Sequence, residues 1–319
     1  MINVVLYYTI GFTLTEQHLA MLRHDFPQCK FTETNKDSVR ETHLETADIL
    51  VGSVPPALVS KAKNLKWLHL PSVGVDRHID TGIYVNADAK LTNSSGAYGK
   101  PISDLVIGYM IALSRDFPYY QRNQEQGIWK RKAPTKELFD STICIVGLGD
   151  IGMELARKAK VFEMHVVAIK RTLVEKPEFV DELYTLETFD EVLKKSDFVV
   201  LCLAATDETV NLMNAARLTM MKKDAYLINV GRGSLIDQKA LYECLANRTI
   251  AGAAVDVTTP EPLPPDDPLW KLDNIMITPH FAGSSPSTPH RLYTIFKSEL
   301  EHYLSGQPLK NLIDFSVKY

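Results

Sequence analysis

The sequence predicts an α/β protein built from two doubly wound parallel sheets with helices on their faces. Short apolar runs alternate with amphipathic helical patterns along nearly the whole chain, as in folds with parallel sheets. One apolar run near the middle leads directly into a glycine-rich turn and then into a helical pattern. The length of 319 residues suits two domains and would be large for a single core.

The first α/β unit is predicted over about the first 96 residues. A helix over residues 15–25 is capped by Thr15 and turns Leu19 and Leu22 inward. A proline opens a second helix over residues 55–62. Strands are predicted at residues 4–8, 49–51 and 67–70.

Residues 71–76, with the sequence PSVGVD, follow the third of these strands. Ligands bind at the carboxyl ends of parallel strands, and free backbone amides in a glycine-containing turn can hold a carboxylate. An ordinary connection between a strand and a helix has the same appearance. The sequence alone leaves both interpretations open.

The two α/β units are joined through a polar and then an apolar stretch. Residues 93–96, NSSG, predict a linker or hinge. Residues 102–113 are apolar on nearly every face and predict a buried helix, closed by Pro118, at a domain boundary or a subunit interface. The polar residues 121–136 surround Trp129 and are expected to wrap a surface or a partner subunit.

The second unit begins with the glycine-rich turn, G-x-G-x-x-G. In this motif Gly147 makes the tight turn, Gly149 lets the backbone approach a pyrophosphate, and Gly152 lets the helix pack on the strand. The pyrophosphate would lie on unpaired amides at the start of that helix, where Asp150 and Ile151 stand. Further strands are predicted at residues 166–169, 198–203, 225–230, 252–257 and 275–278, and helices at residues 191–195, 238–246 and 292–304. The helix at residues 292–304 is expected to pack on the first unit.

The second strand of this unit indicates which dinucleotide is bound. NAD-binding units usually carry Asp or Glu about 20 residues beyond the glycines, to hold the ribose 2′-hydroxyl. Here Lys170, Arg171 and Thr172 occupy that strand end. Arg pairs with phosphate through two hydrogen bonds and Lys adds a point charge, so the sequence favours NADP(H), with NAD(H) still possible. A solvated basic strand end without a role is the alternative.

Three later stretches carry reactive side chains at the ends of predicted strands. Arg232 follows one strand and could grip a keto acid's carboxylate through its guanidinium. Asp256 and Glu261 follow the next strand, and His280 follows the last. A His with a carboxylate partner is a good acid/base, because the partner favours the imidazolium that donates the proton.

Composition and cysteine usage exclude several classes of protein. The net charge of −4 gives no reason to expect nucleic acid or an anionic membrane as a partner, and no apolar run approaches the roughly 18 residues of a membrane span. The four cysteines are far apart and form no metal-ligand spacing, so we expect no metal, reduced thiols and a cytoplasmic protein. The N-terminal residues lack the basic region of a signal peptide and predict a strand.

Five motifs stand in the same order as in the D-isomer-specific 2-hydroxyacid dehydrogenases. They are GLGDIG at 147–152, SDFVVLCLAAT at 196–206, LINVGRGSLID at 227–237, AVDVTTPEPLPPDDPLW at 254–270 and NIMITPHFAG at 274–283. The chain resembles this family over nearly its whole length.

The resemblance implies a role for each matching residue. His280 would be the general acid/base, Glu261 its partner, and Arg232 the ligand of the substrate's carboxylate and carbonyl. The amides of Val73 and Gly74 would also bind the carboxylate. The position of Asp256 would hold the nicotinamide carboxamide, and Val230 and Gly283 would belong to the cofactor site.

The resemblance also implies an architecture. A Rossmann cofactor domain, residues 98–287, would be inserted into a flavodoxin-like substrate domain formed by residues 1–97 and 288–319. Homodimers are usual in the family, built around the helix predicted at residues 102–113.

The chain departs from the family pattern at several positions. Lys170 replaces the usual Asp, which agrees with NADP(H), and Asp150 lies where many members carry Arg. An acid there suits the helix dipole but not the phosphates, so its role is an open question. Ala204 and Ala205 replace a segment that more often contains proline.

Two positions disfavour particular substrates. Leu70 stands where relatives that use phosphoglycerate have a basic residue, and Glu261 stands where formate dehydrogenases have Gln. The leading hypothesis is therefore an NADPH-dependent reductase of small 2-keto acids of the glyoxylate, hydroxypyruvate or pyruvate class. The alternative is a dinucleotide-sensing, corepressor-like binding protein with little turnover. Tyr98 and Trp129 could shape the substrate pocket or serve packing and interfaces.

Overall fold

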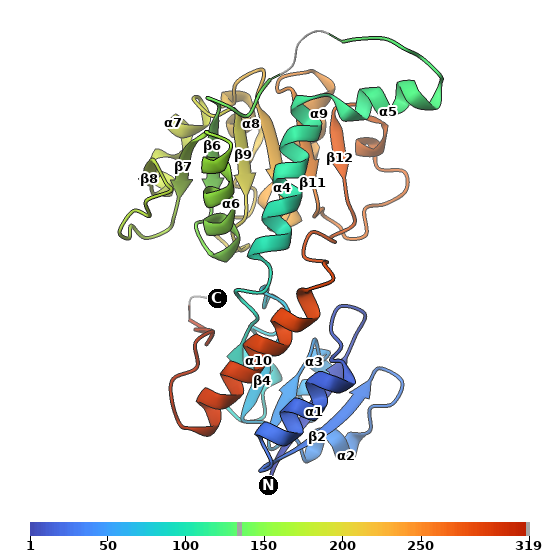
Figure 1. The fold of residues 1–319 in the computed structure, drawn as a ribbon, viewed down its shortest axis with the longest axis vertical. Coiled ribbons are helices and arrows are strands. Elements are labelled where there is room, and N and C mark those ends of the chain that lie inside the picture. Colours follow the sequence, from blue (N-terminus) through green and yellow to red (C-terminus); the bar gives the residue numbers. More distant parts are fainter. Residues whose placement is uncertain (133–135, 317–319) are drawn as a thin grey trace. The chain divides into compact units, whose positions relative to one another are not determined.

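The computed structural model describes residues 1–132 and 136–316, and the chain divides into two compact α/β units. The first unit joins Met1–Tyr98 to Ser284–Tyr319, and the second is Gly99–Gly283. Each unit contains one parallel sheet with helices against it (Figure 1). The predicted fold class, with two doubly wound parallel sheets, is confirmed.

The sheet of the first unit has five parallel strands in the order β2-β1-β3-β4-β5. This is the strand order of flavodoxin-like sheets, whose order reverses between the first and third strands. The elements of this unit are β1 (Ile2–Tyr8), α1 (Glu16–Asp25), β2 (Cys29–Asn35), α2 (Glu41–Glu45), β3 (Ile49–Val51), α3 (Pro56–Val59), β4 (Trp67–His69), β5 (Lys90–Thr92) and α10 (Thr288–Leu304).

Alternate residues of β1 supply the two cores of the first unit. Val4 and Leu6 face one core, which α1 and α10 cover, and Val5 and Tyr7 face the other, which α2 and α3 cover. This alternation is the period of two of a strand that is buried on both faces. Leu292 and other apolar residues of α10 lie in the first of these cores, so the expected packing of the C-terminal helix is confirmed.

Three elements of the first unit were not predicted. The structure adds β2, α2 and β5, and it shortens the helix expected over residues 55–62 to Pro56–Val59. The sequence of β2, CKFTETN, is half polar because this strand lies at the edge of the sheet. A strand of three residues such as β5 is too short to show a period.

Residues 93–96, predicted as a linker or hinge, lie close to the division between the two units, and their first two residues are buried. Ser94 is completely buried, and Asn93 is nearly so. Polar residues can be buried at little cost when hydrogen bonds satisfy them, and the partners of these residues lie within the first unit.

The sheet of the second unit has seven parallel strands in the order β12-β11-β10-β9-β6-β7-β8. The order reverses between β6 and β9, as in the Rossmann fold, and this switch point is where such sheets bind dinucleotides. The elements are α4 (Gly99–Ser114), α5 (Phe117–Glu125), β6 (Thr142–Val146), α6 (Asp150–Val161), β7 (His165–Ile169), β8 (Glu182–Tyr184), α7 (Phe189–Leu193), β9 (Phe198–Leu201), α8 (Ala215–Met220), β10 (Tyr226–Asn229), α9 (Gln238–Ala246), β11 (Gly252–Val255) and β12 (Ile275–Ile277).

Helix α4 packs along α6 and against β10 and β11 inside the second unit. It ends at Ser114, and Pro118 lies in the first turn of α5 instead of closing α4. Proline is favourable there because the first turn needs no amide donor. Part of the polar stretch predicted at residues 121–136 is helical in α5, whereas Trp129 is 99% exposed and residues 133–135 lie outside the described chain.

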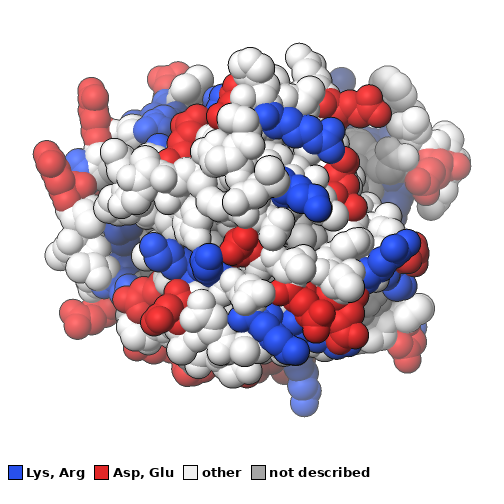
Figure 2. Space-filling view, turned by 90° about the horizontal axis from the view of Figure 1, so that it is seen from below, with Lys and Arg blue, Asp and Glu red and all other residues white. Residues whose placement is uncertain are grey.

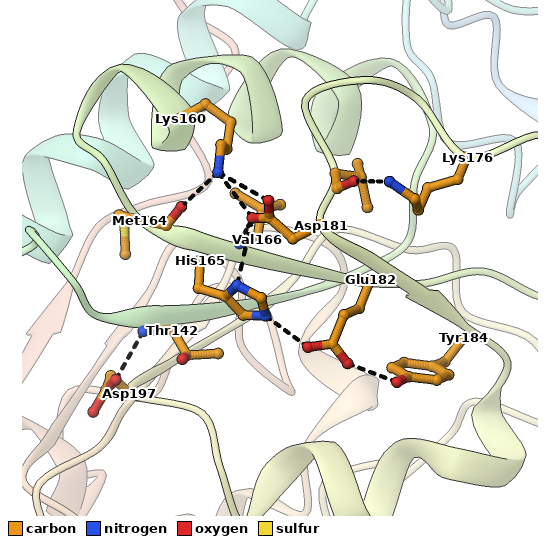
Figure 3. A network of polar contacts seen from close by, with 11 residues as sticks. Thr142, Lys160, Met164, His165, Val166, Lys176, Asp181, Glu182, Tyr184 and Asp197 are labelled. Carbon is orange, nitrogen blue, oxygen red and sulfur yellow. Dashed lines mark hydrogen bonds and ion pairs between the residues drawn. The ribbon is translucent and has the colours of Figure 1, made fainter.

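A polar network closes the amino-terminal edge of the second sheet (Figure 3). Nε2 of His165 lies 2.6 Å from Oε1 of Glu182, and the hydroxyl of Tyr184 donates to Oε2 of the same carboxylate at 2.6 Å. Hydrogen bonds from Tyr184 and His165 hold the pKa of Glu182 below its ordinary value. The network joins β7 to β8 at the edge opposite the glycine-rich turn, and it leaves the carboxyl edge free for function.

The surface is evenly mixed in charge on the face drawn in Figure 2. Lys and Arg side chains alternate there with Asp and Glu side chains, without a broad region of one sign. A small anionic ligand would therefore need local donors more than a long-range field. Among the helices of the described chain, none is long and apolar enough to cross a membrane.

Candidate active site

The predicted functional residues of the second unit follow five strands of one parallel sheet, and residues 170–172 follow β7. The glycine-rich turn follows β6, and the loops with Arg232, Glu261 and His280 follow β10, β11 and β12. All carboxyl ends of a parallel sheet lie at the same edge. The three reactive loops therefore leave three neighbouring strands at the edge where dinucleotides bind.

The three glycines of the turn have different reasons to be glycine. Gly147 has a φ of 104°, and a Cβ there would lie 2.9 Å from the carbonyl oxygen of Cys202 at the end of the neighbouring strand. A Cβ on Gly152 would lie 2.1 Å from the carbonyl oxygen of Gly147. A Cβ on Gly149 would meet no protein atom within 4 Å. The space beside Gly149 is therefore open to a ligand, as the predicted dinucleotide requires.

The start of α6 offers donors to an anion. In the described part of the chain, the backbone amides of Gly149, Asp150 and Ile151 donate no hydrogen bond. Amides at a helix N-terminus, together with the helix dipole, favour negative groups such as a pyrophosphate. These residues fit a dinucleotide.

The side chain of Asp150 has a structural partner within the second unit. Its Oδ2 accepts the amide hydrogen of Gly99, the first residue of α4, at 2.8 Å. A carboxylate at a helix N-terminus satisfies an amide that the helix itself leaves unpaired. Asp150 thus caps α4 with its side chain, and only its backbone amide is available to phosphates.

Two alanine variants should separate the folding role of these glycines from the binding role. We expect Gly152→Ala to lower the free energy of unfolding by about 3 kcal/mol, because the new methyl group overlaps the Gly147 carbonyl. We expect Gly149→Ala to change stability by about 0.5 kcal/mol or less and to raise the Kd of NADPH about tenfold or more. Thermal unfolding and cofactor titration check both, and tight NADPH binding by Gly149→Ala would contradict the assignment.

The basic residues after β7 lie beside the turn. Nζ of Lys170 donates to the carbonyl oxygen of Leu148, between the first two glycines, at 3.2 Å. Arg171 and Thr172 are exposed. A cation is thus held at the strand end where the carboxylate of an NAD-specific site would stand.

The structure brings His280 and Glu261 together. Nδ1 of His280 lies 2.8 Å from Oε2 of Glu261, and Oε1 of the same carboxylate accepts the amide hydrogen of Thr258 at 3.1 Å. The imidazole remains 55% exposed. The carboxylate fixes the orientation of the ring, and the exposed face of the imidazole is open to a bound substrate, as a proton donor or acceptor requires.

Asp256 organises the loop that carries His280. The carboxylate is 2% exposed and accepts the hydroxyl of Thr278 at 2.6 Å and the amides of Phe281 and Ala282 at 3.0 Å. The amide of His280 donates to the carbonyl oxygen of Asp256 at 2.8 Å, which holds His280 at a φ of 50°. The carboxylate of Asp256 therefore positions the loop that carries His280. Its contact with the nicotinamide, implied by the family resemblance, stays a prediction.

Arg232 lies in the loop after β10. The side chain of Asn229 donates to the carbonyl oxygen of Arg232 at 2.8 Å and accepts the amide of Gly231 at 3.1 Å. A Cβ on Gly233 would lie 2.0 Å from the carbonyl oxygen of Thr258, so the loop that carries Arg232 is in close contact with the loop that carries Glu261. The three reactive side chains belong to loops that contact one another.

Val230 and Gly283 are the two remaining residues that were expected at the cofactor site. The amide of Val230 donates to the carbonyl oxygen of Leu201 at 3.1 Å, and its side chain is buried. Gly283 is the last residue of the second unit. Their contact with a cofactor stays a prediction.

In the first unit, the 71–76 loop presents free amides. The backbone amides of Ser72, Val73 and Gly74 donate no hydrogen bond to any residue that the structure describes. The loop is half-buried at these positions. Successive free amides form a site for a carboxylate, so the loop has the donors predicted for Val73 and Gly74.

Several residues around these loops were missed in the sequence or given another role. The side chain of Gln238 accepts the amide of Thr259 at 3.0 Å and donates to Asp267 at 3.1 Å, and thereby braces the loop of Glu261. Tyr98 donates from its hydroxyl to the carbonyl oxygen of Pro71 within the first unit. Neither role has a local sequence signal, because each partner is distant in the sequence.

No group of three or more His, Cys, Asp and Glu side chains is arranged to hold a metal ion in residues 1–132 and 136–316. The groups that the structure places at the carboxyl edge of the second sheet are the His280–Glu261 pair, the loop of Arg232 and the glycine-rich turn.

Comparisons with known proteins agree with this geometry. The family profile described as D-isomer specific 2-hydroxyacid dehydrogenase, NAD binding domain, matches residues 107–282. The chain is 33% identical to the glyoxylate reductase of Korarchaeum cryptofilum over 277 residues, which is 84% of this chain and 82% of that protein. It is 32% identical to the D-3-phosphoglycerate dehydrogenase of Methanocaldococcus jannaschii over 279 residues, 85% of this chain and 52% of that protein.

The chain thus spans about half the length of the phosphoglycerate dehydrogenases that it matches. The chain is also similar to a solved structure from Xanthobacter autotrophicus, a D-isomer specific 2-hydroxyacid dehydrogenase in complex with NADPH and MES. The two chains superpose over the full length of both, with a TM-score of 0.86 and 27% sequence identity.

Proposed function

Because the chain belongs to the D-isomer-specific 2-hydroxyacid dehydrogenases, we propose that it reduces small 2-keto acids of the glyoxylate, hydroxypyruvate or pyruvate class to D-2-hydroxy acids with NADPH. The observation that carries the proposal is the contact between His280 and Glu261 at the edge of the dinucleotide-binding sheet. In this proposal the second unit is the cofactor domain and the first unit the substrate domain.

The proposed chemistry needs one proton and one hydride. When bound, NADPH supplies the hydride that is added to the keto carbon. His280 donates a proton to the keto oxygen, while Glu261, 2.8 Å from Nδ1, holds the ring in one orientation. Arg232 polarises the carbonyl and binds the carboxylate, which combines positioning with electrostatic stabilisation.

The 71–76 loop is the proposed second ligand of the carboxylate. Val73 and Gly74 have free amides, and a carboxylate is the complementary acceptor. In the reverse direction, the same residues would bind a D-2-hydroxy acid and His280 would accept its hydroxyl proton.

Two observations support NADPH as the preferred cofactor. Lys170 is held against the glycine-rich turn, and Arg171 is exposed beside it. The similar protein from Xanthobacter autotrophicus was solved with NADPH. A 2′-phosphate is attracted by two cations and would be repelled by the usual carboxylate.

A substrate without a phosphate group fits the first unit better. Leu70 is only 1% exposed, so it offers neither charge nor surface to a phosphate.

A panel of 2-keto acids tests the proposed function. We expect glyoxylate, hydroxypyruvate or pyruvate to oxidise NADPH in the presence of the enzyme, followed by absorbance, with faster turnover than 3-phosphohydroxypyruvate. Tight NADPH binding without turnover on any of these acids would contradict the proposal and would favour the dinucleotide-sensing binding protein.

We further propose that the chain forms a homodimer through the segment around Trp129. Phe117, Tyr120, Ile128 and Trp129 are all exposed on or after α5, and Trp129 is almost fully exposed. Exposed aromatic and apolar side chains in one segment are typical of a protein interface.

Charged substitutions in this segment should give monomers. We expect the wild-type chain to elute at twice the mass of one chain in size-exclusion chromatography with light scattering, and Ile128→Glu/Trp129→Glu to elute as one chain. Val161→Glu, at another exposed apolar side chain, serves as the control and should remain dimeric. A monomeric wild type would contradict the dimer.

A further inference from the structure

We propose that residues 93–98, the anchor segment, position the carboxylate-binding amides of the 71–76 loop, with Asn93, Ser94 and Tyr98 as positioning residues. The inference rests on the proposed function, because it assigns a role toward the carboxylate that the loop is proposed to bind. It adds residues that touch neither substrate nor cofactor and act through the loop backbone.

The anchor segment holds four consecutive carbonyl groups of the loop and of the residue before it. Each carbonyl oxygen accepts a hydrogen bond from a different donor group of the segment. The bonds are Ser94 Oγ to Leu70 O at 2.9 Å, Tyr98 hydroxyl to Pro71 O, Ser94 N to Ser72 O at 3.0 Å, and Asn93 Nδ2 to Val73 O at 2.8 Å.

These carbonyls decide where the loop amides point. A trans peptide unit is planar, so its carbonyl and the amide of the next residue point in opposite directions. Fixing the carbonyls of Pro71, Ser72 and Val73 toward the anchor segment turns the amides of Ser72, Val73 and Gly74 away from it. These three amides donate no hydrogen bond to any described residue.

The anchor segment is itself held by a directed chain of buried hydrogen bonds. Trp67 Nε1 donates to Thr92 Oγ1 at 2.8 Å, and that hydroxyl lies 2.8 Å from Nδ1 of His69. Nε2 of His69 lies 3.2 Å from Ser94 Oγ, which donates to Leu70 O. Burial lowers the pKa of His69 to about 3, so the ring is neutral and only one of its nitrogens carries a hydrogen. Because the Ser94 hydroxyl gives its hydrogen to Leu70 O, the contact at 3.2 Å requires that nitrogen to be Nε2. The hydroxyl of Ser94 is thereby directed to the loop.

The C-terminal region holds the anchor segment from another side. Nδ2 of Asn311 donates to the carbonyl oxygens of Asn93 at 3.1 Å and Ser95 at 2.9 Å. The buried carboxylate of Glu299 on α10 accepts the amides of Lys310 at 3.1 Å and Asn311 at 3.0 Å. The carbonyls of the loop are thus held by a segment that has little freedom to move.

Tyr98 contributes a donor that does not titrate near neutral pH. Burial raises the pKa of its hydroxyl to about 12. The proton is therefore always available to the Pro71 carbonyl under working conditions. Replacing Tyr98 by Phe removes this one hydrogen bond and keeps the ring.

Asn93→Ala and Asn86→Ala form a matched pair of variants. Both side chains donate from Nδ2 to a backbone carbonyl of the first unit, Asn93 to Val73 at 2.8 Å and Asn86 to Leu65 at 3.0 Å. Both also accept, through Oδ1, the amide two residues further along the chain. Of the two side chains, only that of Asn93 donates to the carboxylate-binding loop. If Asn93 only stabilised the fold, the two variants would have the same effect on the KM for glyoxylate.

We expect Asn93→Ala to raise the KM for glyoxylate about threefold to tenfold, the effect of one lost hydrogen bond on the positions of the amides. The kcat and the KM for NADPH should remain nearly unchanged, because the loss weakens ground state and transition state equally. Asn86→Ala should leave all three constants at the wild-type value. Equal KM values for glyoxylate in the two variants would overturn the inference.

A second pair covers the case in which Asn93→Ala does not fold. Tyr98→Phe removes the bond to Pro71, and Tyr84→Phe removes a bond of the same kind to the carbonyl oxygen of His78, at 2.8 Å. Only Tyr98→Phe should raise the KM for glyoxylate, while both should unfold at similar temperatures. The same KM in both Tyr variants would overturn the inference.

Oxalate binding separates this inference from the proposed function. If the wild-type enzyme turns over no 2-keto acid, the proposed function fails, and the Kd of oxalate is then measured by calorimetry in all five proteins. Weaker oxalate binding in Asn93→Ala and Tyr98→Phe, but not in Asn86→Ala and Tyr84→Phe, supports the positioning role. Equal affinities, or no oxalate binding by the wild type, overturn it.

Discussion

His280→Ala is expected to slow the turnover of glyoxylate by about two to four orders of magnitude, the usual contribution of a general acid. The imidazole is the group that Glu261 orients at 2.8 Å, and it is more than half exposed, so a substrate can reach it. The Kd of NADPH should stay within about twofold of the wild type, because none of the glycine-turn amides depends on His280. Stopped-flow measurement of NADPH oxidation and a fluorescence titration check the two expectations.

His24→Ala provides the matched control. His24 forms a similar contact with a carboxylate, since its Nδ1 lies 2.9 Å from Oδ1 of Asp25 in the first unit. This pair is not near any loop assigned to catalysis, so the turnover rate should not change. Full activity of His280→Ala, or an equal loss in His24→Ala, would show that the proton comes from another group.

Replacing Lys170 by Asp and Arg171 by Ser should reverse the preference for NADPH. Charge-assisted hydrogen bonds contribute about 1.5 to 3 kcal/mol each, so loss of two should lower the ratio of kcat/KM for NADPH to that for NADH about 10²- to 10⁴-fold. The new carboxylate would repel a 2′-phosphate and accept a hydrogen bond from a ribose 2′-hydroxyl. Initial rates with both cofactors at saturating glyoxylate measure the ratio.

Lys194→Asp/Lys195→Ser changes the charge of the second unit by the same amount and serves as the control. These lysines follow α7, and Lys195 lies with His165 at the amino edge of the sheet, away from the glycine-rich turn. The cofactor ratio should remain that of the wild type. A wild-type enzyme that prefers NADH would refute the proposal that NADPH is the preferred cofactor. The assignment of His280 as the proton donor would not be affected.

Much of the candidate site could be predicted because its residues follow strands. Apolar runs that end in Gly147, Arg232 or His280 are recognisable locally, and parallel strands bring their carboxyl ends to one edge. The pairing of His280 with Glu261 was expected from the resemblance to the family, and the structure shows the two side chains in contact.

The role of Asp150 could not be predicted in this way. Its position in the glycine-rich turn suggested an encounter with phosphates, but its carboxylate accepts the amide of Gly99, which lies 51 residues earlier. A hydrogen bond between distant segments leaves no period or spacing in the sequence. The same holds for Gln238 and the loop of Glu261.

The sequence by itself determined the fold class, the glycine-rich turn and the order of the reactive loops, because these depend on periodicity and on residues adjacent in the chain. The tertiary structure alone decided that Asn93 and Ser94, in the stretch predicted as a linker or hinge, are buried within the first unit. Their polar groups are satisfied by carbonyls near Pro71 and by Asn311, which lies 218 residues from Asn93. Local propensity reports only that a segment is polar, whereas burial depends on whether distant segments supply hydrogen-bond partners.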